Sequence, residues 1–128
     1  MSDIKLPKVL EFFKTKSLTK GRIETTLHLF MLDAEVFDSI CLSYIRQECS
    51  IVECRIGSTI KNPKDKYDKV VAKQEAYKKL KKQRLDITSL SVRKGVSYLY
   101  LNADVYIRRS SSGNITVHSY PGVSKEAV

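Results

Sequence analysis

The chain has 128 residues, of which 42% are hydrophobic and 29% charged, and its formal net charge is +9. This length and composition suit one globular domain with its own core and argue against global disorder. The three cysteines are odd in number, lack a CxxC spacing and follow no signal peptide, so neither a disulfide framework nor a zinc site is expected. The apolar stretches are too short to span a bilayer. We therefore expect a cytoplasmic protein without a cofactor and without a membrane partner.

The first part of the chain contains a helical pattern followed by a strand pattern. In residues 6–16 the apolar side chains fall on one side of a helix, which predicts a short N-terminal amphipathic helix. Residues 22–31 alternate between apolar and polar. They predict a half-buried strand with Leu27 on the core face and His28 on the other face.

A second helix and a second strand are predicted next. Asp33 can cap a helix that runs to about Glu48. Its apolar residues recur at the spacing of a buried stripe that begins at Phe37 and ends at Ile45. Residues 51–57 follow as a strand.

Residues 61–84 hold most of the charge of the chain. They contain ten Lys and Arg against three acidic residues, a net charge of +7, whereas the preceding residues are neutral and the following ones carry +2. Clustered Lys and Arg displace the counterions condensed on nucleic acid, so the segment indicates a polyanionic partner. Two other interpretations stay open, a solvated surface and an acidic protein partner.

The same segment is predicted to be one long basic helix. Asn62 can be its N-cap, Pro63 suits the first helical position, and Asp65 favours the positive end of the dipole. One side of this helix is moderately apolar and would pack on the core; it comprises Tyr67, Val70, Val71, Gln74, Tyr77 and Leu80. The lysines of the last turn would project into solvent.

Three strands are predicted to close the chain, over residues 87–94, 97–108 and 114–120. The long middle strand places three tyrosines and Arg108 on one face. Such a face can stack unpaired bases on its rings and contact phosphates through Arg. Tyr is also a preferred strand residue, so the same face can be covered by a helix or form a homodimer interface with a second subunit.

The last two strands form the clearest predicted hairpin. Pairing Arg109 with Gly113 places apolar residues consistently on the core face and puts Asp104 opposite His118. A carboxylate beside a histidine can support proton transfer, but a cross-strand ion pair explains the two residues more simply. No nucleophile is identifiable beside them, so no catalytic residue is predicted.

A metal-dependent nuclease is a minor alternative. Glu53, Cys54 and Arg55 resemble one half of the metal-binding motif of restriction-type nucleases. Such sites need a second, metal-binding Asp on the preceding strand, whereas here a helix is predicted to precede. No metal site is therefore predicted.

A further resemblance covers residues 60–80, where NPKDKYD is followed by a helix with spaced alanines. This pattern is similar to one in small phage-encoded proteins of uncharacterised type. The resemblance implies an accessory protein that acts in the host cytoplasm on host nucleic acid or on a host factor.

Together these patterns predict an α+β fold. It would be a single domain over residues 1–128 with about five mostly antiparallel strands, two longer helices and a short N-terminal helix, and residues 119–128 would form a flexible tail.

The predicted function is that of a non-enzymatic accessory protein that binds DNA or RNA. The alternative is a small inhibitor or adaptor that docks on an acidic protein through the basic helix and the tyrosine-rich face. The residues predicted to contact phosphates or bases are Lys66, Lys69, Lys73, Lys78, Lys79, Lys81, Lys82, Arg84, Tyr98, Tyr100, Tyr106 and Arg108.

Overall fold

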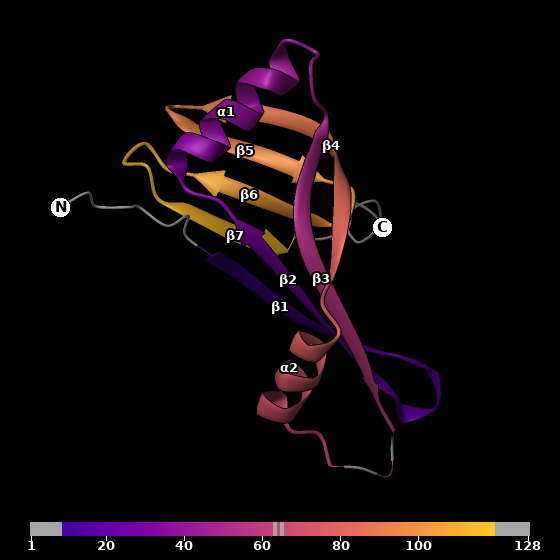
Figure 1. Cartoon of the computed structure of the whole chain (residues 1–128). Helices are drawn as coiled ribbons and strands as arrows, with labels where there is room; N and C mark the ends of the chain where they lie inside the picture. Colours follow the sequence, from indigo (N-terminus) through magenta and orange to yellow (C-terminus); the bar gives the residue numbers. More distant parts are fainter. Residues whose placement is uncertain (1–8, 63, 65, 120–128) are drawn as a thin grey trace, which may run out of the picture. The chain divides into compact units, whose positions relative to one another are not determined.

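The fold was analysed in a computed structural model, which describes residues 9–62, 64 and 66–119 (Figure 1). These residues form seven strands, two α-helices and one short 3-10 helix: β1 (Val9–Ser17), η1 (Thr19–Gly21), β2 (Ile23–Met31), α1 (Ala34–Ile45), β3 (Ile51–Lys61), α2 (Lys69–Lys78), β4 (Lys81–Arg93), β5 (Val96–Leu101), β6 (Val105–Arg109) and β7 (Ile115–Ser119). The strands follow chain order from β1 to β7 in the sheet. In the described part of the chain, neither helix is both long and apolar enough to cross a membrane.

The predicted α+β fold with five strands is wrong, because the described chain is mostly β and has seven strands. Two differences account for the two additional strands. The N-terminal segment expected to be a helix forms β1, and the single long strand predicted over residues 97–108 is a hairpin of β5 and β6.

Two neighbouring phenylalanines explain why the N-terminal segment is a strand. The Phe12 ring lies 5.9 Å from the His28 ring, whereas Phe13 packs on the cluster around Leu27 and Leu29. Successive side chains of a strand point to opposite faces, so β1 can serve both contacts. Tertiary contacts thus overrode the helical grouping of the apolar residues.

The chain divides into two compact units. Unit 1 comprises Met1–Leu10, Met31–Val52 and Arg84–Val128, and unit 2 comprises Glu11–Phe30 and Glu53–Gln83. The long strands β3 and β4 each contribute residues to both units.

Unit 2 is built around the contact of α2 with β2 and β3. Leu27, Leu29 and Ala76 form its buried cluster, and Phe13 and Leu80 pack against it. Gly57 on β3 makes this contact possible, because a Cβ atom at that position would lie 2.0 Å from the carbonyl oxygen of Ala76. Backbone therefore packs directly on backbone where α2 crosses β3.

Helix α2 is shorter than predicted and buries a different side. It begins after Asp68, whose carboxylate accepts hydrogen bonds from the N–H groups of Val70 and Val71 at 2.9 and 3.3 Å. Asn62 is therefore not the N-cap, while Pro63 and Asp65 lie outside the described residues.

Most of the side of α2 that was expected to pack on the core is exposed, although Leu80 at its end does pack on the cluster. Val70, Val71 and Tyr77 are 64%, 51% and 54% exposed. The small residues Ala72 and Ala76 are buried in their place. The close approach of the Ala76 backbone to Gly57 favours a small residue at this point of the helix.

In unit 1, β4, β5, β6 and β7 pair antiparallel and bury one face. The buried residues of these four strands are Leu85, Ile87, Leu99, Leu101, Val105, Ile107 and Ile115. Helix α1 lies over this sheet in Figure 1, and Asp38 of α1 pairs with Arg109 of β6 at 2.7 Å. Arg109 alternates with Arg108, so α1 covers the face opposite to that of Arg108.

The prediction for α1 is confirmed at its start and only in part along its stripe. Asp33 caps the helix, accepting a hydrogen bond of 2.8 Å from the Val36 N–H. Phe37 is fully buried, but Ile45 at the end of the expected stripe is 64% exposed.

The last two hairpins differ from the prediction. The β5–β6 hairpin was predicted as one strand, and the β6–β7 hairpin has another register. Asn102 and Asp104 belong to the turn between β5 and β6, and Asp104 takes a positive φ of 60°. In the β6–β7 hairpin Arg109 pairs with Ile115 rather than Gly113, which shifts the register by two residues. Because the shift is even, the apolar residues stay on the core face while every cross-strand neighbour changes.

Candidate nucleic-acid interface

One face of the sheet in unit 1 carries two cross-strand rows of polar and aromatic side chains. Strand pairing aligns them as Ser91, Tyr98, Arg108 and Thr116 in one row and Ser89, Tyr100, Tyr106 and His118 in the other. We call these eight residues the tyrosine face. The hairpin of β5 and β6 thus brings together Tyr98, Tyr100, Tyr106 and Arg108, which the sequence had placed along a single strand.

Tyr106 lies at the centre of the tyrosine face. Its ring centroid is 5.4 Å from that of Tyr100, 6.2 Å from that of Tyr98 and 5.1 Å from the ring of His118, which stacks on it at an interplanar angle of 24°. Nε2 of His118 in turn shares a hydrogen bond of 2.7 Å with the Thr116 hydroxyl. These contacts hold four rings as one surface rather than as independent side chains.

The tyrosine face is partly exposed. Its three tyrosines, Arg108 and His118 are each half-buried. Helix α1 packs on the opposite face of these strands. Helix α1 therefore does not cover the rings.

His118 was predicted on the same face as Tyr106 but was not included among the predicted site residues. The predicted pairing of Asp104 with His118 is wrong, because His118 lies opposite Tyr106 and Asp104 belongs to the preceding turn. The proton-transfer pair considered for these two residues is therefore not formed. The signal for the true register was the Ser-Gly-Asn stretch before β7, in which Gly113 takes a φ of +95° and the Ser110 hydroxyl accepts from the Asn114 N–H.

The predicted basic residues do not all lie on one helix. Lys69, Lys73 and Lys78 belong to α2, and Lys79 is its C-cap. Lys81, Lys82 and Arg84 lie on β4 instead, and Lys66 precedes the helix. All of these residues except Arg84 belong to unit 2, whereas Arg84 and the tyrosine face belong to unit 1.

Three of these lysines already have partners inside unit 2. Lys73 pairs with Glu11 at 2.7 Å, Lys78 pairs with Glu75 at 3.5 Å, and the Lys69 ammonium lies 5.6 Å from the centroid of the Phe13 ring. Such exposed ion pairs contribute about 0–1 kcal/mol, so a phosphate could replace the carboxylates at little cost.

The remaining lysines of the predicted set differ from these three. Lys66, Lys79, Lys81 and Lys82 are exposed, and no ion-pair partner for them occurs among the described residues. These four are therefore the strongest candidates for phosphate contacts.

Unit 2 as a whole is even more positively charged than the segment 61–84. The segments of unit 2 contain fourteen Lys and Arg against six Asp and Glu, a net charge of +8, which leaves +1 for unit 1. The neutral residues 1–60 conceal this separation, because their central acidic residues belong to unit 1. The basic residues that unit 2 gains in this way, and that the prediction omitted, are Lys14, Lys16, Lys20, Arg22 and Arg55.

The described residues offer no cluster for metal chemistry. Among them, no group of three or more His, Cys, Asp or Glu side chains is arranged to hold a metal ion. Glu53 and Arg55 lie exposed on β3, while burial raises the pKa of the intervening Cys54 thiol to about 11. The nuclease half-motif therefore gains no further ligand from the fold.

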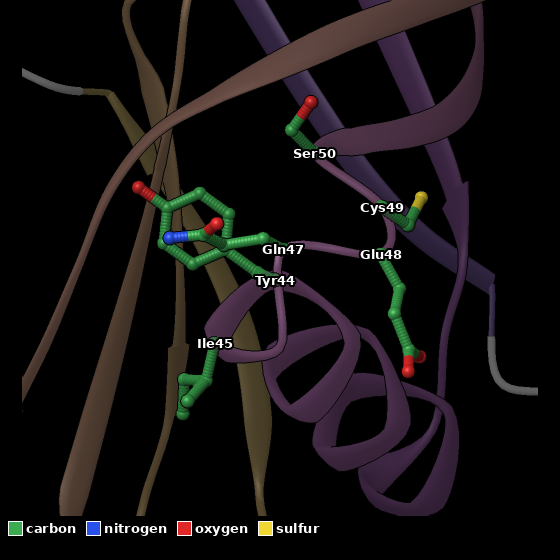
Figure 2. Close-up of a pocket in the computed structure, with 6 residues that line it drawn as sticks. All are labelled: Tyr44, Ile45, Gln47, Glu48, Cys49 and Ser50. Atoms are coloured by element: carbon green, nitrogen blue, oxygen red, sulfur yellow. The ribbon is translucent and has the colours of Figure 1, made fainter.

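A surface hollow of about 450 Å³ lies at the C-terminal end of α1 (Figure 2). It is lined by Tyr44, Ile45, Gln47, Glu48, Cys49 and Ser50. The side chains of Glu48 and Cys49 point away from each other in Figure 2, and the Cys49 thiol donates to the Ile51 carbonyl at 3.4 Å. The hollow therefore does not bring an acid–base pair and a nucleophile to one point.

Comparison of the chain with protein-family models, with curated proteins and with solved structures finds no match. Function must therefore be argued from the geometry of the chain itself.

Proposed function

We propose that this chain is a non-enzymatic protein that binds single-stranded nucleic acid, with unpaired bases stacked on the tyrosine face and phosphates bound by the lysines of unit 2. The observation that carries the proposal is the tyrosine face, a partly exposed sheet surface with four adjoining rings and an arginine. Base–aromatic stacking contributes about 1–3 kcal/mol per base and tolerates any sequence.

The charge distribution supports the same proposal from a second direction. Unit 2 carries most of the net charge, and its exposed lysines can attract phosphates through contacts that need no defined base sequence. With the resemblance of residues 60–80 to small phage-encoded proteins, the target would be host nucleic acid.

The proposal predicts a preference for unpaired strands. A labelled oligonucleotide should bind more tightly as a single strand than after annealing to its complement, because a duplex hides the faces of its bases. Fluorescence anisotropy at low salt measures both affinities. Equal affinity for the two forms would exclude base stacking, and no binding to either would reject the function.

Tyr106 provides the residue-level test, since its ring contacts the three other rings of the face. Tyr106→Ala should weaken single-strand binding by about 1–3 kcal/mol, whereas the matched control Tyr106→Phe should retain nearly all of it, because stacking needs the ring and not the hydroxyl. An alanine variant that remains folded and binds as tightly as the wild type would contradict the proposed role of the face.

A second candidate function, a protein-binding inhibitor or adaptor, is favoured by the outward side of α2. Val70, Val71 and Tyr77 are exposed there beside lysines, as suits an interface with an acidic protein. Affinity capture separates the two candidates. Recovery of one stoichiometric protein that survives nuclease treatment would favour the adaptor, and loss of all partners on that treatment would favour nucleic acid.

A further inference from the structure

A second hollow, of about 390 Å³, adjoins the tyrosine face at the end of β5. It is lined by Thr88, Ser89, Tyr100, Leu101, Asn102 and Asp104. Its volume falls within the range of about 300–1,000 Å³ that is common for small-molecule pockets. Because Ser89 and Tyr100 belong to both surfaces, a strand lying on the tyrosine face would pass the mouth of this hollow.

Two backbone irregularities form the hollow. The register of β4 against β5 shifts between Ile87 and Ser89, so that an additional residue, Thr88, is accommodated beside Tyr100. Such β-bulges redirect side chains and recur beside functional sites. On the other side, the turn from β5 to β6 holds Asp104 in a left-handed conformation, with φ at 60°.

Asn102 is fixed in this hollow by β4. Its N–H donates to the Asp86 carbonyl at 3.0 Å, and its Oδ1 accepts from the Asp86 N–H at 3.2 Å. The acceptor of the amide is thereby used, while its NH₂ group has no hydrogen-bond partner among the described residues. Asn102 therefore presents a donor whose position is set before any ligand binds.

The residues that line the hollow carry the amide donor of Asn102, the two carboxylate oxygens of Asp104, the hydroxyls of Thr88 and Ser89, and the Tyr100 ring. A carboxylate is best satisfied by two neighbouring donors. Among the bases, guanine alone presents two adjacent donors, N1–H and the N2 amine, on its Watson–Crick edge. Its O6 acceptor lies on the same edge and can take a hydrogen bond from an amide.

We propose that this hollow binds an unpaired guanine, with Asp104 accepting from N1–H and the N2 amine, Asn102 donating to O6, and Tyr100 in contact with the base. This inference rests on the proposed binding of single-stranded nucleic acid. It adds a base preference to a surface whose stacking contacts alone would not distinguish one base from another.

The test uses oligothymidylates that differ at one central position. The guanine-containing strand should bind at least about tenfold more tightly than the strands with adenine or cytosine. Replacing guanine by inosine removes only the N2 amine, so it should abolish most of this preference. Because this comparison uses the wild-type protein, it does not depend on the folding of any variant.

Asp104→Asn tests the residue itself. Asparagine has nearly the same size and also tolerates a left-handed backbone, so the turn should be kept. The variant should lose the guanine preference and still bind plain oligothymidylate. Glu35→Gln removes the same charge from an exposed position on α1 and should leave the preference unchanged.

The outcomes separate this inference from the function on which it rests. Binding of oligothymidylate without a guanine preference, or a preference that survives Asp104→Asn, would overturn the guanine site and leave the proposed function standing. Failure of every oligonucleotide to bind would overturn both.

Discussion

Among the described residues, His28 is the most deeply buried ionisable side chain. It is 2% exposed, its ring lies parallel to that of Phe30 and close to that of Phe12, and no hydrogen-bond partner for its Nδ1 occurs among the described residues. Burial lowers the pKa of His28 to about 4, with a further contribution from the positive charge of Lys14. The imidazole is therefore neutral at physiological pH. Its expected place on a solvent-facing side of the strand was wrong.

This residue should make the fold sensitive to mild acid. In the unfolded chain His28 takes up a proton near its ordinary pKa of 6.5, whereas in the folded chain it resists protonation until about pH 4. Stability is thus complete above pH 6.5 and decreases as the pH falls from there towards 4. Between pH 7 and pH 5 the loss from this residue should be about 2 kcal/mol.

Urea unfolding at the two pH values checks this expectation, with His28→Leu as the comparison. The leucine variant keeps an apolar side chain at this buried position and cannot titrate, so its stability should decrease much less over the same interval. Equal losses in the two proteins would show that His28 is not the source.

At the scale of elements, the position of α2 depends on one residue of β3. A methyl group at Gly57 would meet the carbonyl oxygen of Ala76 at 2.0 Å, and a helix backbone cannot move away as a flexible side chain would. Gly57→Ala should therefore destabilise unit 2 by about 1–3 kcal/mol or more, as is typical of overpacking. Thermal unfolding measures the change.

Ser58→Ala is the control for this substitution, because Ser58 is the next residue on the same strand and is exposed. It should shift the unfolding midpoint little. Unchanged stability of Gly57→Ala would show that α2 does not approach β3 as closely as described.

Local sequence patterns correctly predicted some of the strands and helices. Alternation identified β2, and the Asp33 cap with its apolar stripe identified α1. The pattern failed for β1, because Phe12 and Phe13 pack on opposite faces of their strand. It failed for the apolar side of α2, because Ala72 and Ala76, which the helix buries, carry a weaker hydrophobic signal than the exposed valines.

The candidate site was predicted in its residues but not in its geometry. The alternation along residues 97–108 correctly grouped the tyrosines, since a hairpin preserves the face of each residue. The turn between β5 and β6 places the tyrosines in two cross-strand rows. Asn102 and Asp104 indicated it, because both residue types favour turns over strand interiors. The stacking of His118 on Tyr106 depends on the hairpin register, which the sequence did not determine.

At the scale of the whole molecule, chemistry is divided between the two units. Unit 2 holds nearly all of the net charge, and unit 1 holds the rings and the polar hollow beside them. We therefore expect affinity and base preference to be separable: charge changes in unit 2 should alter salt dependence, and changes on the tyrosine face should alter discrimination between strands.

The most direct test is the salt dependence of single-strand binding in two variants of equal net charge. One variant replaces Lys81 and Lys82 with Gln, and the control replaces Arg46 and Lys94, which are exposed in unit 1, with the same residue. Each phosphate contact contributes about 0.7 to the slope of log Kobs against log salt concentration for single strands. The first variant should therefore lose about 1.4 from the slope and the control almost none, because Arg46 and Lys94 belong neither to unit 2 nor to the tyrosine face. Equal slopes in the two variants would contradict the proposed role of the unit 2 lysines.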